Sequence, residues 1–143
     1  MALIRETVYA ALWARLAAVP GIVTASRRLR HVADVAPLEQ PALFMAQGPQ
    51  RAEYATGATT LWFLRGDIYL YAVAQDDGAP GPVINPLMDA VLAVFAPDNL
   101  MVNACTLGGV VRYAKIAGEI ETDEGTMGAQ ALVRIPFELH QIA

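Results

Sequence analysis

Apolar residues near the start of the chain recur at the spacing of a helix. The apolar positions lie four residues apart: Ile4, Val8, Leu12 and Leu16. This spacing predicts an amphipathic helix over residues 3–18, with those four side chains on one face. The Pro20-Gly21 dipeptide ends the helix, because proline cannot continue it and glycine favours its C-terminal end.

The next two segments favour strands. In residues 22–37, "IVTASRRLRHVADVAP", the spacing of the apolar residues fits a strand and its exit better than a second helix. Residues 40–48, "QPALFMAQG", form a short apolar run bounded by Pro41 and by Gly48-Pro49. A run of this length between such breakers predicts a buried strand. Residues 49–60 are mixed and poorly patterned, and we expect a loop there that becomes ordered on assembly.

Residues 59–74 alternate across an Arg-Gly-Asp tripeptide at 65–67. The even-numbered positions include the apolar residues Trp62, Leu64, Ile68, Leu70 and Ala72. The odd-numbered positions include Arg65, Asp67, Tyr69 and Tyr71. Because the parity does not change across Gly66, the pattern predicts one long strand. A hairpin turn at Gly66-Asp67 is the competing interpretation, but the preferred turn order places glycine second. We therefore predict that the tripeptide lies inside a sheet and not in an exposed adhesion loop.

The second half predicts one more helix and more strands. "DDGAPGP", residues 76–82, is typical of a loop, and Asn85-Pro86 resembles an N-cap followed by proline at the first helical position. The inner face of this helix, which Pro97 ends, consists of Leu87, Val91, Val94 and Phe95. Residues 106–125 and 128–142 are β-like, and the second of these alternates strictly. The whole chain, residues 1–143, is predicted to be a single α+β domain with two helices on a largely antiparallel sheet.

The composition is that of an associating subunit. Hydrophobic residues make up 55% of the 143 residues and charged residues 17%, more apolar than the interior of a small monomer requires. The surplus predicts a surface that meets another subunit. A net charge of −4 disfavours nucleic-acid binding as the main function. No apolar run is long enough for a membrane span, and we expect no export signal and no disulfide, since Cys105 is the only cysteine.

The sequence offers little chemistry. Ser26 is the only serine and lacks a nucleophile-elbow motif. Cys105, His31 and His140 lie in no recognisable protease or zinc-site context. The only lysine, Lys115, follows no glycine-rich phosphate loop. We therefore expect no catalytic residue, no cofactor and no metal site.

Two charged clusters suggest a subunit interface instead. Arg27, Arg28 and Arg30, beside His31, are basic, and the densest acidic stretch is Glu119, Glu121, Asp123 and Glu124. Alternation places Glu119, Glu121 and Asp123 on one strand face, where they repel unless a partner neutralises them. A cation site, catalytic carboxylates and a solvated turn before Gly125 are the alternatives. We hypothesise that the basic cluster of one subunit faces the acidic strand of its neighbour.

Three stretches together resemble small tail proteins of tailed bacteriophages and prophages, of the tail-terminator or tail-completion kind. They are "QPALFMAQG", "GPVINPLMDAVLAVFAPD" and "TLGGVVRYAKIAGEIETDEGTMGAQALVRIPFEL". The matching positions are Thr106, Leu107, Gly108 and Gly109, and then Asp123, Glu124, Gly125 and Gly128. The sequence departs from the family at Arg112, Tyr113 and Lys115, where a more apolar or aromatic strand is expected.

The resemblance implies a small α+β structural subunit of the virion tail, synthesised in the bacterial cytoplasm. Such subunits form a homo-oligomeric ring, usually hexameric, that caps the tail tube and joins it to the head. The implied partners are further copies of the chain, the tail tube and head-connector proteins, with DNA only as passing cargo and no membrane. We expect the interface to include the two charged clusters together with Thr106, Gly108 and Gly109, and loops 49–59 and 76–82 to contact tube or head.

Two other functions remain open. One is a ligand-binding or enzymatic α+β domain whose pocket uses Tyr69, Tyr71 and Arg65. The other keeps the phage context but makes the chain a head-tail connector or baseplate subunit, because these share small α+β subunits and ring symmetry.

Overall fold

The computed structural model describes residues 3–75 and 78–143, without the side chain of Met127. Within these residues the chain forms two α-helices, six strands and three single-turn 3-10 helices. In chain order they are α1 (Arg5–Ala17), β1 (Thr24–Ser26), η1 (Val32–Asp34), η2 (Pro37–Glu39), β2 (Ala42–Glu53), β3 (Leu61–Val73), α2 (Gly81–Leu92), η3 (Ala93–Phe95), β4 (Tyr113–Ile116), β5 (Glu121–Met127) and β6 (Gln130–Ile142).

The strands form one sheet in the order β1-β2-β3-β6-β4, and β5 also pairs with β6. Strand β1 is parallel to β2, and the other pairings are antiparallel. The long strands β3 and β6 lie at the centre and pair without a break from Leu61–Ile142 to Val73–Gln130. The predicted α+β fold with a largely antiparallel sheet is therefore confirmed.

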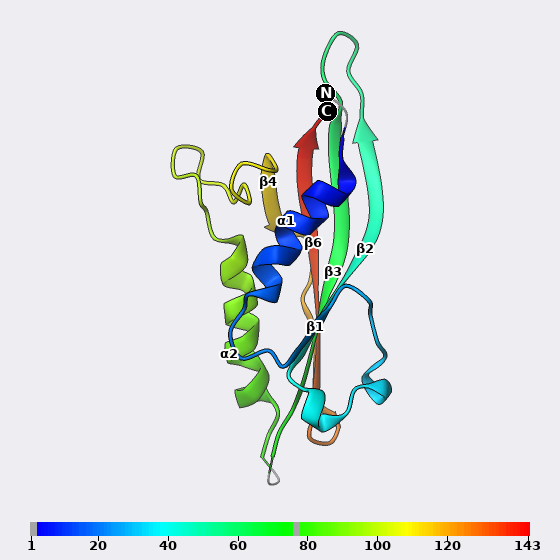
Figure 1. The fold of residues 1–143 in the computed structure, drawn as a ribbon, viewed down its shortest axis with the longest axis vertical. Coiled ribbons are helices and arrows are strands. Elements are labelled where there is room, and N and C mark those ends of the chain that lie inside the picture. Colours follow the sequence, from blue (N-terminus) through cyan, green and yellow to red (C-terminus); the bar gives the residue numbers. More distant parts are fainter. Residues whose placement is uncertain (1–2, 76–77) are drawn as a thin grey trace.

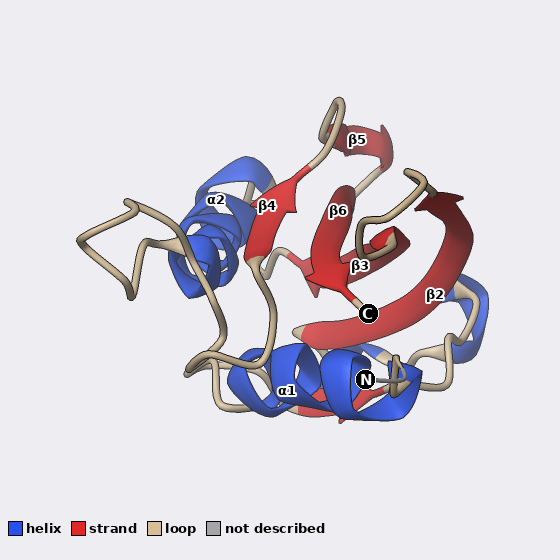
Figure 2. Cartoon of the chain, turned by 90° about the horizontal axis from the view of Figure 1, so that it is seen from above, coloured by secondary structure: helices blue, strands red, loops and turns tan. Residues whose placement is uncertain are grey.

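Both α-helices lie on the same face of this sheet (Figures 1 and 2). The main core consists of the inward faces of α1 and α2 and one parity of the central strands, including Leu64, Ile68, Leu70, Val133, Ile135, Phe137 and Leu139. Val8, Leu12 and Leu16 of α1 are buried in it as predicted. Ile4 is not buried: it is 63% exposed, because the helix begins only at Arg5. Tyr9 is the buried residue of the first turns together with Val8.

The alternating segment is a single strand, as predicted. Strand β3 passes straight through the Arg-Gly-Asp tripeptide, with Gly66 opposite Phe137. A Cβ on Gly66 would lie 2.4 Å from Phe137 Cζ and 2.6 Å from the Ala46 carbonyl oxygen. Glycine is therefore required here for close packing, since it leaves room for the aromatic ring to lie on the backbone.

Strand β2 is longer than the sequence predicts. It continues to Glu53 through a bulge between Gln47 and Gln50, where Gly48 and Pro49 lie. Residues 50–53 therefore belong to the sheet and not to the predicted loop. The bulge interrupts the pairing opposite Arg65, and the buried Tyr9 hydroxyl donates a 2.8 Å hydrogen bond to the Arg65 carbonyl. A helix side chain thus supplies the donor that the bulged strand does not.

The second helix begins earlier than the sequence predicts. Helix α2 starts at Gly81 with Pro82 in its first turn, so Asn85 is not an N-cap and Pro86 lies inside the helix. Pro82 is the proline that fits the first turn, where a missing N–H costs nothing. Val91 is fully buried, while Leu87, Val94 and Phe95 pack at the margin of the core. Of the predicted loop 76–82, Asp76 and Asp77 lie outside the described residues.

Two segments predicted to be β-like are strands only in part: residues 106–125 contain β4 and most of β5, and the remainder forms turns. Only Thr24–Ser26 of residues 22–37 is a strand, and the chain then makes two 3-10 turns. Residues 106–112 precede β4 as turns in which Leu107, Gly108 and Gly109 have φ of 51°, 73° and 90°. A positive φ is incompatible with a strand, which explains the pair of glycines. Residues 128–142 were predicted to be a strand, and β6 confirms this over 130–142.

Candidate functional site

The sheet face opposite α1 and α2 is polar, and none of the described α-helices covers it. We call it the open face. Its central residues come from the second parity of β3 and β6: Arg65, Asp67, Arg134, Glu138 and His140. Cross-strand neighbours there carry opposite charges, and each listed side chain takes part in an ion pair.

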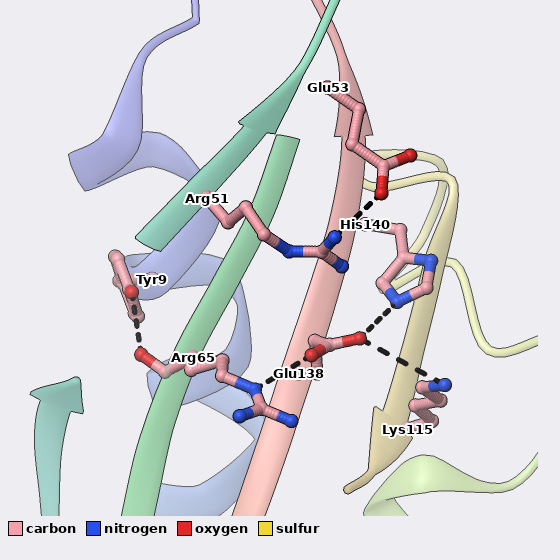
Figure 3. Close-up of polar contacts among 7 residues, drawn as sticks. All are labelled: Tyr9, Arg51, Glu53, Arg65, Lys115, Glu138 and His140. Carbon is pink, nitrogen blue, oxygen red and sulfur yellow. Dashed lines mark hydrogen bonds and ion pairs between the residues drawn. The ribbon is translucent and has the colours of Figure 1, made fainter. Parts of the chain in front are cut away.

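Glu138 is the centre of this polar network (Figure 3). Its side chain is only 10% exposed, and its carboxylate lies 2.7 Å from Arg65 Nε, 2.6 Å from His140 Nε2 and 3.9 Å from Lys115 Nζ. Burial raises the pKa of the Glu138 carboxyl, but the hydrogen bonds from His140 and Arg65 outweigh burial and hold that pKa below its ordinary value. The His140 ring also packs edge-on against Phe63, with ring centroids 4.6 Å apart.

Arg134 forms a second polar centre towards β5. Its guanidinium lies 2.7 Å from Asp67 Oδ1 and 3.0 Å from Glu121 Oε1. The hydrogen bond from Arg134 lowers the pKa of the Glu121 carboxyl, and the two carboxylates raise the pKa of the guanidinium. Both charged residues of the tripeptide are thus bound within the chain, Arg65 to Glu138 and Asp67 to Arg134. It is not a presented adhesion motif.

A groove lies at one end of the open face. The segment 28–40 covers this end, where Val35, Ala42, Phe44 and Tyr71 form a small second core and the Tyr71 hydroxyl donates to the Arg30 carbonyl at 2.7 Å. The groove, of about 440 Å³, is bounded by this segment and β5. We call it the aromatic groove; it is lined by His31, Val32, Tyr69, Tyr71, Glu121, Thr122, Asp123, Leu132, Val133 and Arg134.

The aromatic groove contains two of the three residues that the sequence suggested for a ligand pocket. Tyr69 and Tyr71 line it as expected, and partial burial raises the pKa of each phenol. Arg65 does not line it, because its side chain is held against Glu138 farther along the sheet. The groove therefore has aromatic walls, and the guanidinium group that lines it belongs to Arg134 and not to Arg65.

A loop with an apolar tip projects on the helix side of the molecule. Residues 97–104 follow η3, and Figure 2 shows the loop extending past α2, away from β2. We call this segment the tip loop. Its three central side chains are exposed, Leu100 to 85%, Met101 to 96% and Val102 to 64%.

The base of the tip loop is fixed by one carboxylate. Asp98 accepts hydrogen bonds from the Thr106 N–H at 2.7 Å, the Thr106 hydroxyl at 2.8 Å and the Gly108 N–H at 2.9 Å, and Arg15 lies 3.1 Å away. These hydrogen bonds hold the pKa of the Asp98 carboxyl far below its usual range, and the bonds from the Gly108 and Thr106 backbone N–H groups have the largest effect. The "TLGG" stretch is therefore the anchor of the tip loop.

The basic cluster is partly neutralised within the chain. Arg27 pairs with Glu6 at 2.6 Å, and Arg30 pairs with Glu39 at 2.7 Å while also donating to the Asp34 carbonyl. Among the described residues, Arg28 has no ion-pair partner.

The acidic residues lie beside this basic cluster. Glu121 and Asp123 share the open face, as the alternation predicted, whereas Glu119 precedes β5. His31 and Asp123 line the same groove, so the two charged clusters are neighbours within one subunit. Thr106, Gly108 and Gly109 lie elsewhere, at the base of the tip loop.

Two features were missed by the sequence reasoning. The Arg65–Glu138 pair joins residues 73 apart, so only the β3–β6 register could have shown it. The tip loop had a signal: three consecutive apolar residues between Asn99 and Asn103, in a stretch opened by Pro97-Asp98. An apolar triplet in a loop has no core to enter, which makes it a candidate contact.

Neither a metal centre nor a membrane-spanning helix is present in the part of the chain that the structure describes. No group of three or more His, Cys, Asp or Glu side chains is placed there to hold a metal ion. No described helix is long and apolar enough to cross a membrane.

Comparison with known proteins gives a likeness of fold. No protein-family model and no curated protein sequence matches the chain. A chain solved in the virion of a native gene transfer agent (GTA) particle matches with a TM-score of 0.55 and 12% sequence identity, over 100% of both chains. A second solved structure matches with a TM-score of 0.52 and 13% identity, over 96% of each chain. The chain is therefore similar in fold, over its full length, to a chain of the gene transfer agent virion.

Proposed function

We propose that the chain is a structural subunit of a phage-like virion, and specifically a tail-terminator-like subunit that forms a homo-oligomeric ring. The observation that carries this proposal is the full-length likeness of fold to a chain of the gene transfer agent virion. The fold match and the stretches that resemble tail terminators in sequence are independent, and both lead to the same class of particle.

The surface chemistry supports a role in assembly. Exposed apolar side chains gather on loops and chain ends, where they cover none of the chain's own core; they include Leu38, Tyr54, Leu100, Met101 and Val102. Such positions favour contacts with other subunits. A ring requires two different surfaces on each subunit, one at either side. The tip loop and the aromatic groove are two such surfaces.

The predicted interface residues divide between these two surfaces. Thr106, Gly108 and Gly109 support the tip loop, while the charged clusters surround the aromatic groove. Among the described residues, Arg28, Glu119 and Asp123 form no ion pair and are the candidates for pairing between subunits, whereas Arg27, Arg30 and Glu121 already have partners. The ring would cap a tail tube and join it to head proteins, and a net charge of −4 would let DNA pass without binding.

The first experiment is to measure the mass of the purified protein by light scattering across concentration, with negative-stain images of any large species. We expect a closed ring of one discrete mass that binds a purified tail tube. A monomer at every concentration that also fails to bind the tube would refute the ring function. Ring formation without tube binding would instead favour a connector or baseplate subunit.

The aromatic groove supports one other function, binding of a small ligand between Tyr69 and Tyr71. This function predicts a compact monomer or dimer whose melting temperature rises with an aromatic ligand. A screen of small aromatic compounds by thermal shift tests it. The absence of any shift, together with a ring, would exclude it.

A further inference from the structure

We infer that the tip loop of one copy seats in the aromatic groove of the next copy, so that Leu100, Met101 and Val102 enter the groove. This inference rests on the proposed self-assembly and names the contact that produces it. The occupant of the groove is thus a second copy of this chain.

The tip loop is suited to docking because it is already ordered. Asp98 ties its base to Thr106 and Gly108, and the loop is closed by bridges between Asn99 and Ala104 and between Cys105 and Ala114. A loop that is held in shape loses little conformational freedom on binding. Its three exposed side chains then contribute apolar area at small entropic cost.

The aromatic groove has the composition of a receiving site. Val32, Tyr69, Tyr71 and Leu132 provide apolar side chains, and these residues also pack around the second core, which fixes their positions. Glu121, Asp123 and Arg134 add polar and charged groups. An apolar centre within a polar rim is the usual anatomy of a protein interface, and tyrosine is enriched there.

The two surfaces cannot meet within one subunit. The groove lies near the end of β3, whereas Val102 of the tip loop lines a hollow with Phe63 and His140 near the start of β3, at the other end of the sheet. A contact between two different surfaces is heterologous, and repeating it generates a ring or a filament. The placement therefore matches the geometry that the proposed function requires.

Charge complementarity supports the same pairing. Arg112 lines the hollow beside Val102, is exposed, and has no ion pair among the described residues. Asp123 at the groove is likewise without an ion pair within the described chain. With the tip loop seated, Arg112 of one copy approaches Asp123 of the next. Such a pair at the edge fixes orientation more than it adds affinity.

The test uses one variant of each surface, Met101→Asp in the tip loop and Leu132→Lys in the groove. Each variant alone is expected to associate at least about tenfold more weakly than the wild type, because a charge replaces a buried apolar contact. Mixed together they should form a dimer and nothing larger, since one intact loop and one intact groove remain. The matched control is Val23→Asp, an exposed apolar residue (61%) that lines neither the groove nor the hollow beside the tip loop, which should assemble normally.

The outcomes separate this inference from the proposed function. If the wild type and both variants form the same ring, the loop-to-groove contact is wrong and the ring function stands. If both variants are monomeric but their mixture forms no dimer, the contact is also wrong. If the wild type forms no oligomer, both the proposed ring and this contact are wrong. Formation of the mixed dimer also shows that both variants are folded.

Discussion

Gly66→Ala tests the close packing at the centre of the sheet. The added Cβ would lie 2.4 Å from Phe137 Cζ and 2.6 Å from the Ala46 carbonyl oxygen. Both distances are well inside van der Waals contact. The Phe137 ring is fully buried and packs edge-on against Tyr9, with centroids 6.4 Å apart, so it cannot move without disturbing α1.

The expected cost follows from these contacts. Forcing one extra carbon into a packed core costs about 1–3 kcal/mol, and the lower entropy of the unfolded alanine chain returns at most about 1 kcal/mol. Because one of the two clashes is with a backbone carbonyl, the cost should lie in the upper part of this range, about 2–3 kcal/mol, and we expect a net loss of about 1–2 kcal/mol in the free energy of unfolding. At about 2–4 °C for each kcal/mol, the melting temperature should fall by roughly 2–8 °C.

Urea unfolding followed by circular dichroism measures this loss, and the matched control is Gly48→Ala in β2. A Cβ on Gly48 would meet its nearest atoms at 3.4–3.5 Å, which is ordinary contact, so the control should be nearly neutral. In the double variant with Phe137→Leu, part of the Gly66→Ala cost should disappear, because the nearest ring atom is removed. Equal stability of Gly66→Ala and the wild type would refute the packing argument.

Three further predictions concern side chains that fix the fold and the tip loop. Tyr9→Phe removes the hydroxyl that donates to the Arg65 carbonyl, and urea unfolding should show a loss of about 1–3 kcal/mol. Glu138→Gln should destabilise the protein at pH 7; because the pKa of Glu138 is lowered on folding, the difference from the wild type should shrink as the pH falls below about 4, through the folded pKa. Asp98→Ala should speed hydrogen exchange of the Thr106 and Gly108 amides without loosening β3, and unchanged exchange at both amides would contradict the anchor.

The strongest sequence patterns predicted the central elements well. The strict alternation in β3 and β6 and the four-residue spacing in α1 reflect burial of one face, which the sequence records directly. The failures lie where local signals compete. Pro49 normally ends a strand, but here it lies at a bulge in the outer part of β2, which β1 does not pair, so the strand continues. At α2, Pro82 and Pro86 could each start the helix; the pattern around Asn85-Pro86 favours the second, but the helix uses Pro82 in its first turn.

The candidate site was less predictable, for a physical reason. The charged residues were visible in the sequence, but the partner of each depends on strand register and on where the turns place them. Arg30, which is predicted to face a neighbouring subunit, also pairs within the chain with Glu39, nine residues away, and this pairing could not be seen from the charge pattern alone. The apolar triplet of the tip loop is visible in the sequence, but only the structure shows that Leu100 and Met101 are exposed and have no core to enter.

The satisfied charges of the open face decide which surfaces associate. Covering Arg65 and Glu138 with another subunit would remove their ion pair from water, and this desolvation offsets most of any Coulombic gain. The tip loop has no such penalty, because its exposed side chains are apolar. Association through the tip loop should therefore persist or strengthen in 1 M sodium sulfate, since kosmotropic salts favour apolar burial, whereas pairing of charged clusters alone would weaken through screening. Dissociation of the assembly at high salt would identify the charged clusters, rather than the tip loop, as the contact that holds the subunits together.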